Sequence, residues 1–287
     1  MTKDLYLAAP PWTGIWHRFR VIDHARVFAK HTGCKLHFLW AVSHGVSNCR
    51  FEELLSPIPA VQIFNLSEAE MDGLEQQALN SKSLDFRDRK LEIYRAGGKI
   101  AKQMFAFDFD GARALEATTA SSTVTTVRPL QVIPAAGLCS KAGRYIRELQ
   151  IPQRVGIRVR VTECDIDGRK PRRVQAELDD AIRSIVRIPW YVPVFLVTDS
   201  EYIQQMLASH FHDSRYLPKR FTERGKVGHY VSRLDKDGMQ SFLIEVSCLL
   251  KCRKIINIGG FLNQDSVAGK IIPPPWKLET VGLRRAL

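Results

Sequence analysis

The chain has 287 residues, enough for one large domain or two of ordinary size. Its 45% apolar and 25% charged residues are the usual balance of a globular protein and exclude a disordered chain. A formal net charge of +12 favours polyanionic partners: nucleic acid, an anionic membrane surface or a phosphorylated small molecule. Charge alone does not select among these partners.

The six cysteines are spread along the chain, unlike the dense framework of a disulfide-rich protein. Cys248 and Cys252 lie one helical turn apart without neighbours that complete a zinc site, so we expect them to pack in the core. The first residues lack the apolar run of a signal peptide. No segment approaches the ~20 apolar residues of a membrane span. The sequence predicts a cytoplasmic protein.

The first half of the chain begins with a pattern typical of a βαβ unit. An apolar strand is predicted at 4–9, a helix at 16–31 that ends at Thr32-Gly33, and a second strand at 35–40. Such a unit implies a parallel sheet. A short helical turn is predicted at 51–55, and residues 65–125 show little pattern apart from a polar helical patch at 67–79.

The second half repeats the alternation of strands and helices. The predicted strands are 155–161, 192–199 and 254–258, and the predicted helices are 176–186, 200–209 and 241–251. We therefore predict an α/β fold with two Rossmann-type domains, whose parallel sheets face a cleft in a GT-B-like arrangement. The N-terminal domain is expected at 1–148 and the C-terminal domain at 149–287.

Several segments, in order, resemble the fucosyltransferase-like family of enzymes that use GDP-sugars. The family's G-x-G-N-R-L-R loop is similar to Gly14-Ile-Trp-His-Arg-Phe-Arg20, and its F-E-D-L-F-like turn to Phe51-Glu-Glu-Leu-Leu55. Its G-V-H-I-R-R-T-D motif is similar to Gly156-Ile-Arg-Val-Arg-Val-Thr-Glu163. A strand that ends in T-D-S corresponds to Phe195-Leu-Val-Thr-Asp-Ser200. The last motif, a helix that carries an acidic residue before a strand and a small-residue turn, corresponds to 242–261.

The resemblance implies that 1–148 is the acceptor-side domain and that 149–287 is the nucleotide-sugar-binding domain. It also implies that Arg160 contacts the donor's β-phosphate. A guanidinium suits a leaving pyrophosphate because it stays charged and donates two parallel hydrogen bonds. Arg158 replaces a family histidine, and Glu163 stands where many members have aspartate. The alternative is that Arg158 and Arg160 lie on one solvated strand face, and that Glu163 is an ordinary surface carboxylate.

Glu245 matches the family's aspartate that recognises guanine. A carboxylate suits guanine because it accepts hydrogen bonds from both N1–H and the N2 amino group. The alternative is an internal ion pair, since a carboxylate in an apolar helix needs a partner. Asp199 follows a predicted parallel strand, where ligands bind in open α/β sheets, although it is equally well placed to cap the next helix. A basic loop with Lys219, Arg220 and Arg224 either closes on the donor or is simply solvated.

In the first motif, Gly14 allows a ligand to approach the backbone, and His17 and Arg18 follow at the start of the helix. His17 is a candidate base near neutral pH. The glycine turn after the last strand offers backbone N–H groups to phosphate. The predicted site is catalytic Arg160, His17 and Glu163, with donor-binding Gly14, Arg18, Arg158, Thr162, Thr198, Asp199, Ser200, Arg224, Glu245, Gly259, Gly260 and Phe261.

The sequence thus predicts a metal-independent glycosyltransferase without a cofactor, which moves fucose or a related sugar from a GDP-sugar donor to a glycan or lipid-linked glycan. We expect peripheral contact with an anionic membrane and no nucleic acid partner. Three alternatives remain. Asp108-Phe-Asp110 resembles the metal-binding D-x-D of GT-A transferases. The net charge also fits a polyanion-binding or nucleic-acid-binding protein, and the departures from the family motifs fit a homologue that binds nucleotide without turnover.

Overall fold

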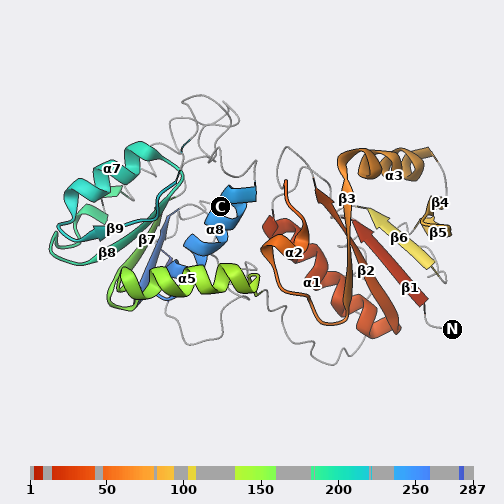
Figure 1. The fold of residues 1–287 in the computed structure, drawn as a ribbon, viewed down its shortest axis with the longest axis horizontal. Helices are drawn as coiled ribbons and strands as arrows, with labels where there is room; N and C mark the ends of the chain where they lie inside the picture. Colours follow the sequence, from red (N-terminus) through yellow and green to blue (C-terminus); the bar gives the residue numbers. More distant parts are fainter. Residues whose placement is uncertain are drawn as a thin grey trace, which may run out of the picture. The chain divides into compact units, whose positions relative to one another are not determined.

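The computed structural model describes residues 3–8, 15–42, 48–80, 83–93, 103–107, 133–159, 182–183, 185–219, 221, 236–258 and 278–280. The chain forms two compact units, residues 1–133 and 134–287, which are described separately (Figure 1). Both have an α/β architecture in which parallel strands are linked by helices, as the sequence predicts.

Unit 1 contains a six-stranded sheet with the order β3-β2-β1-β6-β5-β4. Its elements are β1 Lys3–Ala8, α1 Ile15–Thr32, β2 Cys34–Val42, α2 Phe51–Leu54, β3 Val61–Ser67, α3 Glu68–Asn80, β4 Ser83–Phe86, β5 Arg89–Ile93 and β6 Gln103–Phe107. Gly33, with φ of 69°, ends α1 in the left-handed conformation that glycine adopts without strain.

The sheet of unit 1 departs from the predicted all-parallel arrangement at one edge. β4 pairs antiparallel with β5, while the other strand pairs are parallel. The turn between them is made by Arg87 and Asp88, which both have positive φ, as type I′ hairpin turns require. A two-residue turn reverses the chain directly, whereas a parallel partner needs a longer crossover. The sequence pattern did not indicate this hairpin.

Unit 2 contains a five-stranded, fully parallel sheet with the order β11-β10-β7-β8-β9. Its elements are α5 Ala136–Glu148, the short 3₁₀ helix η1 Ile151–Gln153, β7 Val155–Val159, β8 Val194–Thr198, α7 Glu201–His210, β9 Ser214–Arg215, α8 Lys236–Leu249, β10 Lys254–Ile258 and β11 Leu278–Thr280.

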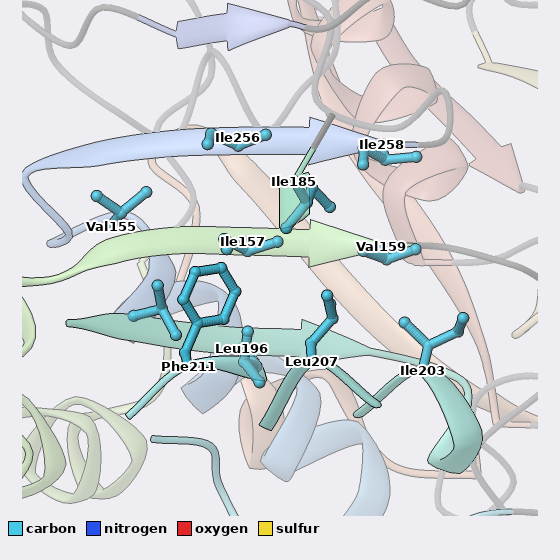
Figure 2. Packing of buried hydrophobic residues seen from close by; sticks show 11 residues of the cluster. Val155, Ile157, Val159, Ile185, Leu196, Ile203, Leu207, Phe211, Ile256 and Ile258 are labelled. Atoms are coloured by element: carbon cyan, nitrogen blue, oxygen red, sulfur yellow. The ribbon is translucent and has the colours of Figure 1, made fainter. Parts of the chain in front are cut away.

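The two faces of the unit 2 sheet are covered by different helices. On one face, Ile157 and Val159 of β7 lie beside Ile256 and Ile258 of β10, with α7 packed against the strands (Figure 2). Because side chains alternate along a strand, Gly156 and Arg158 face the opposite side. There a Cβ atom on Gly156 would lie 2.6 Å from Leu249 Cδ1, so α8 packs directly on the β7 backbone.

The helix α5 belongs to unit 2, because it packs against α8, and the Cys248 thiol lies 4.0 Å from the Ala142 carbonyl oxygen. The two units therefore divide at residues 133 and 134, before α5, whereas the predicted domain boundary follows it at 148 and 149. No helix was predicted from the sequence at the position of α5.

Candidate functional site

The order of strands in unit 2 places a topological switch point between β7 and β10. The chain moves from β7 to β8 and β9 on one side, and later returns to β10 on the other side of β7. In open α/β sheets, ligands bind outside the carboxyl ends of strands at such a point, because the helices that follow diverge to opposite faces. We define the carboxyl edge of unit 2 as the ends of β7, β8 and β10, which the register places together at Val159, Thr198 and Ile258.

Arg158 and Asn257 join the two strands of the switch point. Arg158 Nη1 donates a hydrogen bond of 2.7 Å to Asn257 Oδ1, and both side chains are buried on the face covered by α8. Arg158 therefore does not lie on a solvated strand face. A guanidinium carries five N–H donors, and the bond to Asn257 uses one of them.

The end of β8 carries Thr198, Asp199 and Ser200, the three residues predicted there. Thr198 is buried, and its Oγ1 accepts a hydrogen bond of 3.2 Å from the Ser200 backbone N–H. Ser200 is the N-cap of α7, because its Oγ accepts from the backbone N–H of Ile203 at 3.4 Å. The cap role that the sequence assigned to Asp199 as an alternative is thus filled by Ser200. Asp199 is half-buried next to it.

Glu245 is inside unit 2 and forms an ion pair with Lys219. Lys219 Nζ lies 2.7 Å from Glu245 Oε1, and the side chains are 3% and 2% exposed. The ammonium also lies 5.4 Å from the centroid of the Phe221 ring, a distance that allows a cation–π interaction. The internal ion pair that the sequence left open for Glu245 is therefore present.

The position of Glu245 on α8 places it toward the carboxyl edge. Leu249 lies against Gly156 at the start of β7, and α8 then leads into the first residue of β10. The helix therefore runs opposite to the strands. Glu245 is one turn earlier, about 6 Å closer to the carboxyl edge.

Burial and the nearby Glu245 charge raise the pKa of the Cys248 thiol to about 12. Cys248 is therefore an uncharged thiol in the core of unit 2.

In unit 1, the predicted site residue Arg18 is fully packed inside the protein. Its Nη1 donates a hydrogen bond of 2.6 Å to the Ala41 carbonyl oxygen, and its guanidinium carbon lies 4.8 Å from the centroid of the Trp40 ring. Burial lowers the pKa of Arg18 to about 10. These contacts give Arg18 a packing role in α1, and donor binding by Arg18 stays a prediction. The backbone of His17 is in the first turn of α1.

Several predicted residues lie outside the part of the chain that the structure describes. These are Gly14, Arg160, Thr162, Glu163, Arg224, Gly259, Gly260 and Phe261, together with Asp108 and Asp110 of the alternative metal motif. Their positions in the sequence are nevertheless informative. Arg160 directly follows β7, and Gly259 directly follows β10, so both continue from strands of the switch point.

Asn257, the partner of Arg158, was not among the residues predicted from the sequence. A polar residue inside the apolar run of β10 is the signal that could have found it, since a buried amide requires a hydrogen-bond partner. Lys219 was recognised as part of a basic loop, but its burial against Glu245 was not predicted. Within the described ranges, no three His, Cys, Asp or Glu side chains gather as a metal-binding group. None of the helices that the structure describes is long and apolar enough to cross a bilayer.

Comparisons with known proteins agree on the fold. The sequence matches no protein family model and no curated protein. Among solved structures, it is similar to NodZ α1,6-fucosyltransferase soaked with GDP-fucose, with a TM-score of 0.51 and 15% identity over 94% of this chain and 91% of that one. The same enzyme crystallised with GDP gives 0.50 and 15% over 90% and 88%.

A further structure of fucosyltransferase NodZ, from Bradyrhizobium, gives a TM-score of 0.50 and 16% identity over 89% of this chain and 88% of that one. The resemblance to fucosyltransferase-like proteins that the sequence motifs indicate is thus confirmed at the level of the fold. The likeness covers nearly the whole length of both chains, which share an α/β architecture of parallel sheets.

Proposed function

We propose that the protein is a GT-B-type glycosyltransferase that moves a sugar, fucose or a related one, from a GDP-sugar to a glycan or lipid-linked glycan. The observation that carries the proposal is the switch point of unit 2. There, β7 and β10 meet through Arg158 and Asn257 in a fold shared with an α1,6-fucosyltransferase whose crystals were soaked with GDP-fucose.

The chemistry of donor cleavage gives each residue of this edge a role. As the bond to the sugar breaks, negative charge develops on the departing diphosphate, and preorganised cations and N–H groups stabilise it. We assign this role to Arg160 and to the glycine turn at 259–260, which continue from β7 and β10. Arg158 adds a second guanidinium one register step before the carboxyl edge. In this proposal the two guanidinium groups and the backbone N–H groups act without a metal ion.

Recognition of the base falls to Glu245 in this proposal. Its carboxylate already accepts a charge-assisted hydrogen bond from Lys219, so its side chain is held in one position. A guanine that presents N1–H and its N2 amino group to this carboxylate would satisfy it further, whereas adenine lacks that pair of donors. Specificity of this kind is strong because the other bases cannot offer the carboxylate both donors at once.

The test is calorimetric binding of GDP, with ADP, UDP and CDP for comparison, each with and without EDTA. We expect GDP to bind selectively and EDTA to have no effect. Arg160→Ala should weaken GDP binding by roughly 10- to 100-fold, because it removes hydrogen bonds to a charged group, and Arg160→Lys should restore part of the loss. Arg253→Ala, an exposed arginine at the opposite edge of the sheet, is the matched control.

Turnover is measured separately as the release of GDP from GDP-fucose. GDP binding with turnover supports the proposal, and GDP binding without turnover identifies a degenerate homologue. Binding that requires a divalent ion would overturn the metal-independent mechanism and point to Asp108 and Asp110. If no nucleotide binds while a mixed-sequence oligonucleotide does, the protein is a polyanion-binding protein instead.

A further inference from the structure

The opposite edge of the unit 2 sheet carries two exposed aromatic side chains. Trp190 and Tyr191 precede β8 and are 59% and 67% exposed. This exposure is unfavourable, because the transfer of a large aromatic side chain out of water lowers the free energy. They lie in the segment Ile188-Pro-Trp-Tyr-Val-Pro193, which proline flanks on both sides. Because the strands are parallel, this segment lies at the amino end of the sheet, away from the carboxyl edge.

The aromatic segment is held in a defined conformation. The backbone N–H of Val192 donates to the Pro189 carbonyl at 3.0 Å, and that of His212 donates to the Trp190 carbonyl at 2.9 Å. The Trp190 ring also meets the His212 ring edge-on, with centroids 5.8 Å apart. Side chains on an ordered backbone lose little conformational freedom when they bind, so the segment is prepared for contact.

Exposed cations lie at the same edge of the sheet as the aromatic pair. Arg187 lies just before it, and Lys251 and Arg253 precede β10, which is two strands from β8 and so about 10 Å away. We define the amino-edge patch as Arg187, Trp190, Tyr191, Lys251 and Arg253. All five of these residues are exposed.

Asp213 follows His212, whose ring meets the Trp190 ring, and the charge of Asp213 is neutralised locally. Asp213 Oδ1 lies 3.0 Å from Arg154 Nη1 and 3.5 Å from Arg215 Nε. Hydrogen bonding from Arg154 holds the pKa of this carboxyl below its ordinary value, so it stays charged within its ion pairs. The positive charge of the amino-edge patch is therefore not cancelled by this neighbour.

We infer that the amino-edge patch binds the surface of an anionic phospholipid bilayer. Trp and Tyr prefer the boundary between water and hydrocarbon, where the ring body is buried and the N–H or O–H remains hydrated. Each Lys or Arg near an anionic surface raises the partition coefficient of a protein onto that surface by about fivefold. The overall charge of +12 adds long-range attraction. The inference does not rest on the donor chemistry, which is proposed for the other edge.

Flotation of the full-length protein with vesicles tests the inference. One set of vesicles contains phosphatidylcholine alone, and the other contains phosphatidylcholine and phosphatidylglycerol in equal parts. We expect the protein to bind the anionic vesicles selectively and less tightly at high salt. Joint Trp190→Ala and Tyr191→Ala substitution should lower the partition by roughly tenfold. Tyr202→Ala, which removes a 71% exposed tyrosine from the first turn of α7, is the matched control and should have no effect.

Two further measurements make the outcome decisive. Arg187→Ala, Lys251→Ala and Arg253→Ala should each weaken binding by about fivefold, while Lys141→Ala on α5 should not. Tryptophan emission should shift to shorter wavelength on binding, and the shift should be smaller in Trp190→Phe. Equal binding to neutral and anionic vesicles, or binding that the aromatic variants leave unchanged, would overturn the inference. If an equimolar mixed-sequence oligonucleotide displaces the protein from the vesicles, and the aromatic variants have no effect, the patch is a nucleic acid surface instead.

Discussion

Lys219 and Glu245 are 26 residues apart in the chain, and their side chains form a 2.7 Å ion pair from which water is almost entirely excluded. Such a pair contributes little net stability compared with apolar residues of the same volume, because both ions lose their hydration. Removal of one partner is different, because it leaves the other charge buried without compensation.

We therefore expect Lys219→Met and Glu245→Leu to destabilise the protein by about 3–5 kcal/mol each, and the joint Lys219→Met, Glu245→Leu variant to have a free energy of unfolding close to that of wild type. Urea unfolding followed by circular dichroism measures these differences. Glu148→Gln is the matched control, because Glu148 pairs with Arg144 at 3.7 Å with both side chains more than half exposed, and its loss should cost less than about 0.5 kcal/mol. A joint variant whose loss of unfolding free energy equals the sum of the losses in the two single variants would contradict this account.

Gly156 and Gly143 should respond to alanine with opposite signs. A Cβ atom on Gly156 would lie 2.6 Å from Leu249 Cδ1 and 2.9 Å from Cys252 Sγ, so Gly156→Ala forces α8 away from β7 and should destabilise by about 1–3 kcal/mol. At Gly143, inside α5, the nearest atom is Arg147 Nη1 at 3.8 Å. Gly143→Ala should stabilise by about 0.5–1 kcal/mol, since alanine favours a helix.

The same unfolding assay measures both glycine variants. Equal effects of Gly156→Ala and Gly143→Ala would show that the close approach of α8 to β7 is not the cause. A Gly156→Ala variant that binds GDP normally would further separate packing at the start of β7 from the proposed donor chemistry at its end.

Cysteine reactivity should follow burial. Burial raises the pKa of both Cys248 and Cys252 to about 12, while Cys139 is exposed on α5. Only the thiolate reacts with iodoacetamide. At pH 8 in the native protein we expect Cys139 to be alkylated at least tenfold faster than Cys248 or Cys252, as measured by mass spectrometry of the digested peptides. Rapid alkylation of Cys252 would show that α8 and the turn after it open readily.

The Arg154–Asp213 contact predicts a pH-dependent contribution to stability. In the folded protein the pKa of Asp213 is lowered below its ordinary value, mainly by hydrogen bonding from Arg154. A group with a lowered folded pKa stabilises above its unfolded pKa of about 3.9 and loses this contribution as the pH falls through the folded value. Because the Asp213 side chain is 37% exposed, we expect a contribution of under about 1 kcal/mol.

The comparison is between wild type and Asp213→Asn, unfolded with urea at a series of pH values. The difference in unfolding free energy should be present at pH 7 and shrink as the pH falls below about 4. A difference that is independent of pH would assign the effect to the shape of the side chain rather than to its charge.

The strands of unit 2 could be predicted because most of their residues are apolar and bounded by polar ones. β8 is a continuous apolar run, which is typical of a buried parallel strand, β7 alternates, and β10 is apolar around Asn257. In unit 1, β3 was missed because its side chains are mostly half-exposed and mixed in polarity. No element was predicted at α5, and the predicted domain boundary was placed after it, at 148 and 149.

The site shows the same division between local and long-range information. The positions of Thr198, Asp199 and Ser200 after β8 follow from local pattern, and the structure confirms their place at the end of the strand. The partners of Arg158 and Glu245 do not, because Asn257 and Lys219 are 99 and 26 residues away along the chain. A single sequence gives no signal for contacts of that range. It indicates that a buried charge needs a partner, and not which one.

The central place of β7 also bears on how the protein is made. Its neighbours in the sheet are β8 and β10, and the register joins Val155 to Lys254, so the core of unit 2 closes after most of the chain has left the ribosome. Pairing over such a separation is slow, because a long loop must be ordered before the contact is gained. A nascent chain that ends before β10 would expose the edge of β7 that β10 later covers. Other chains could pair with this edge, so late translational arrest is a route to aggregation.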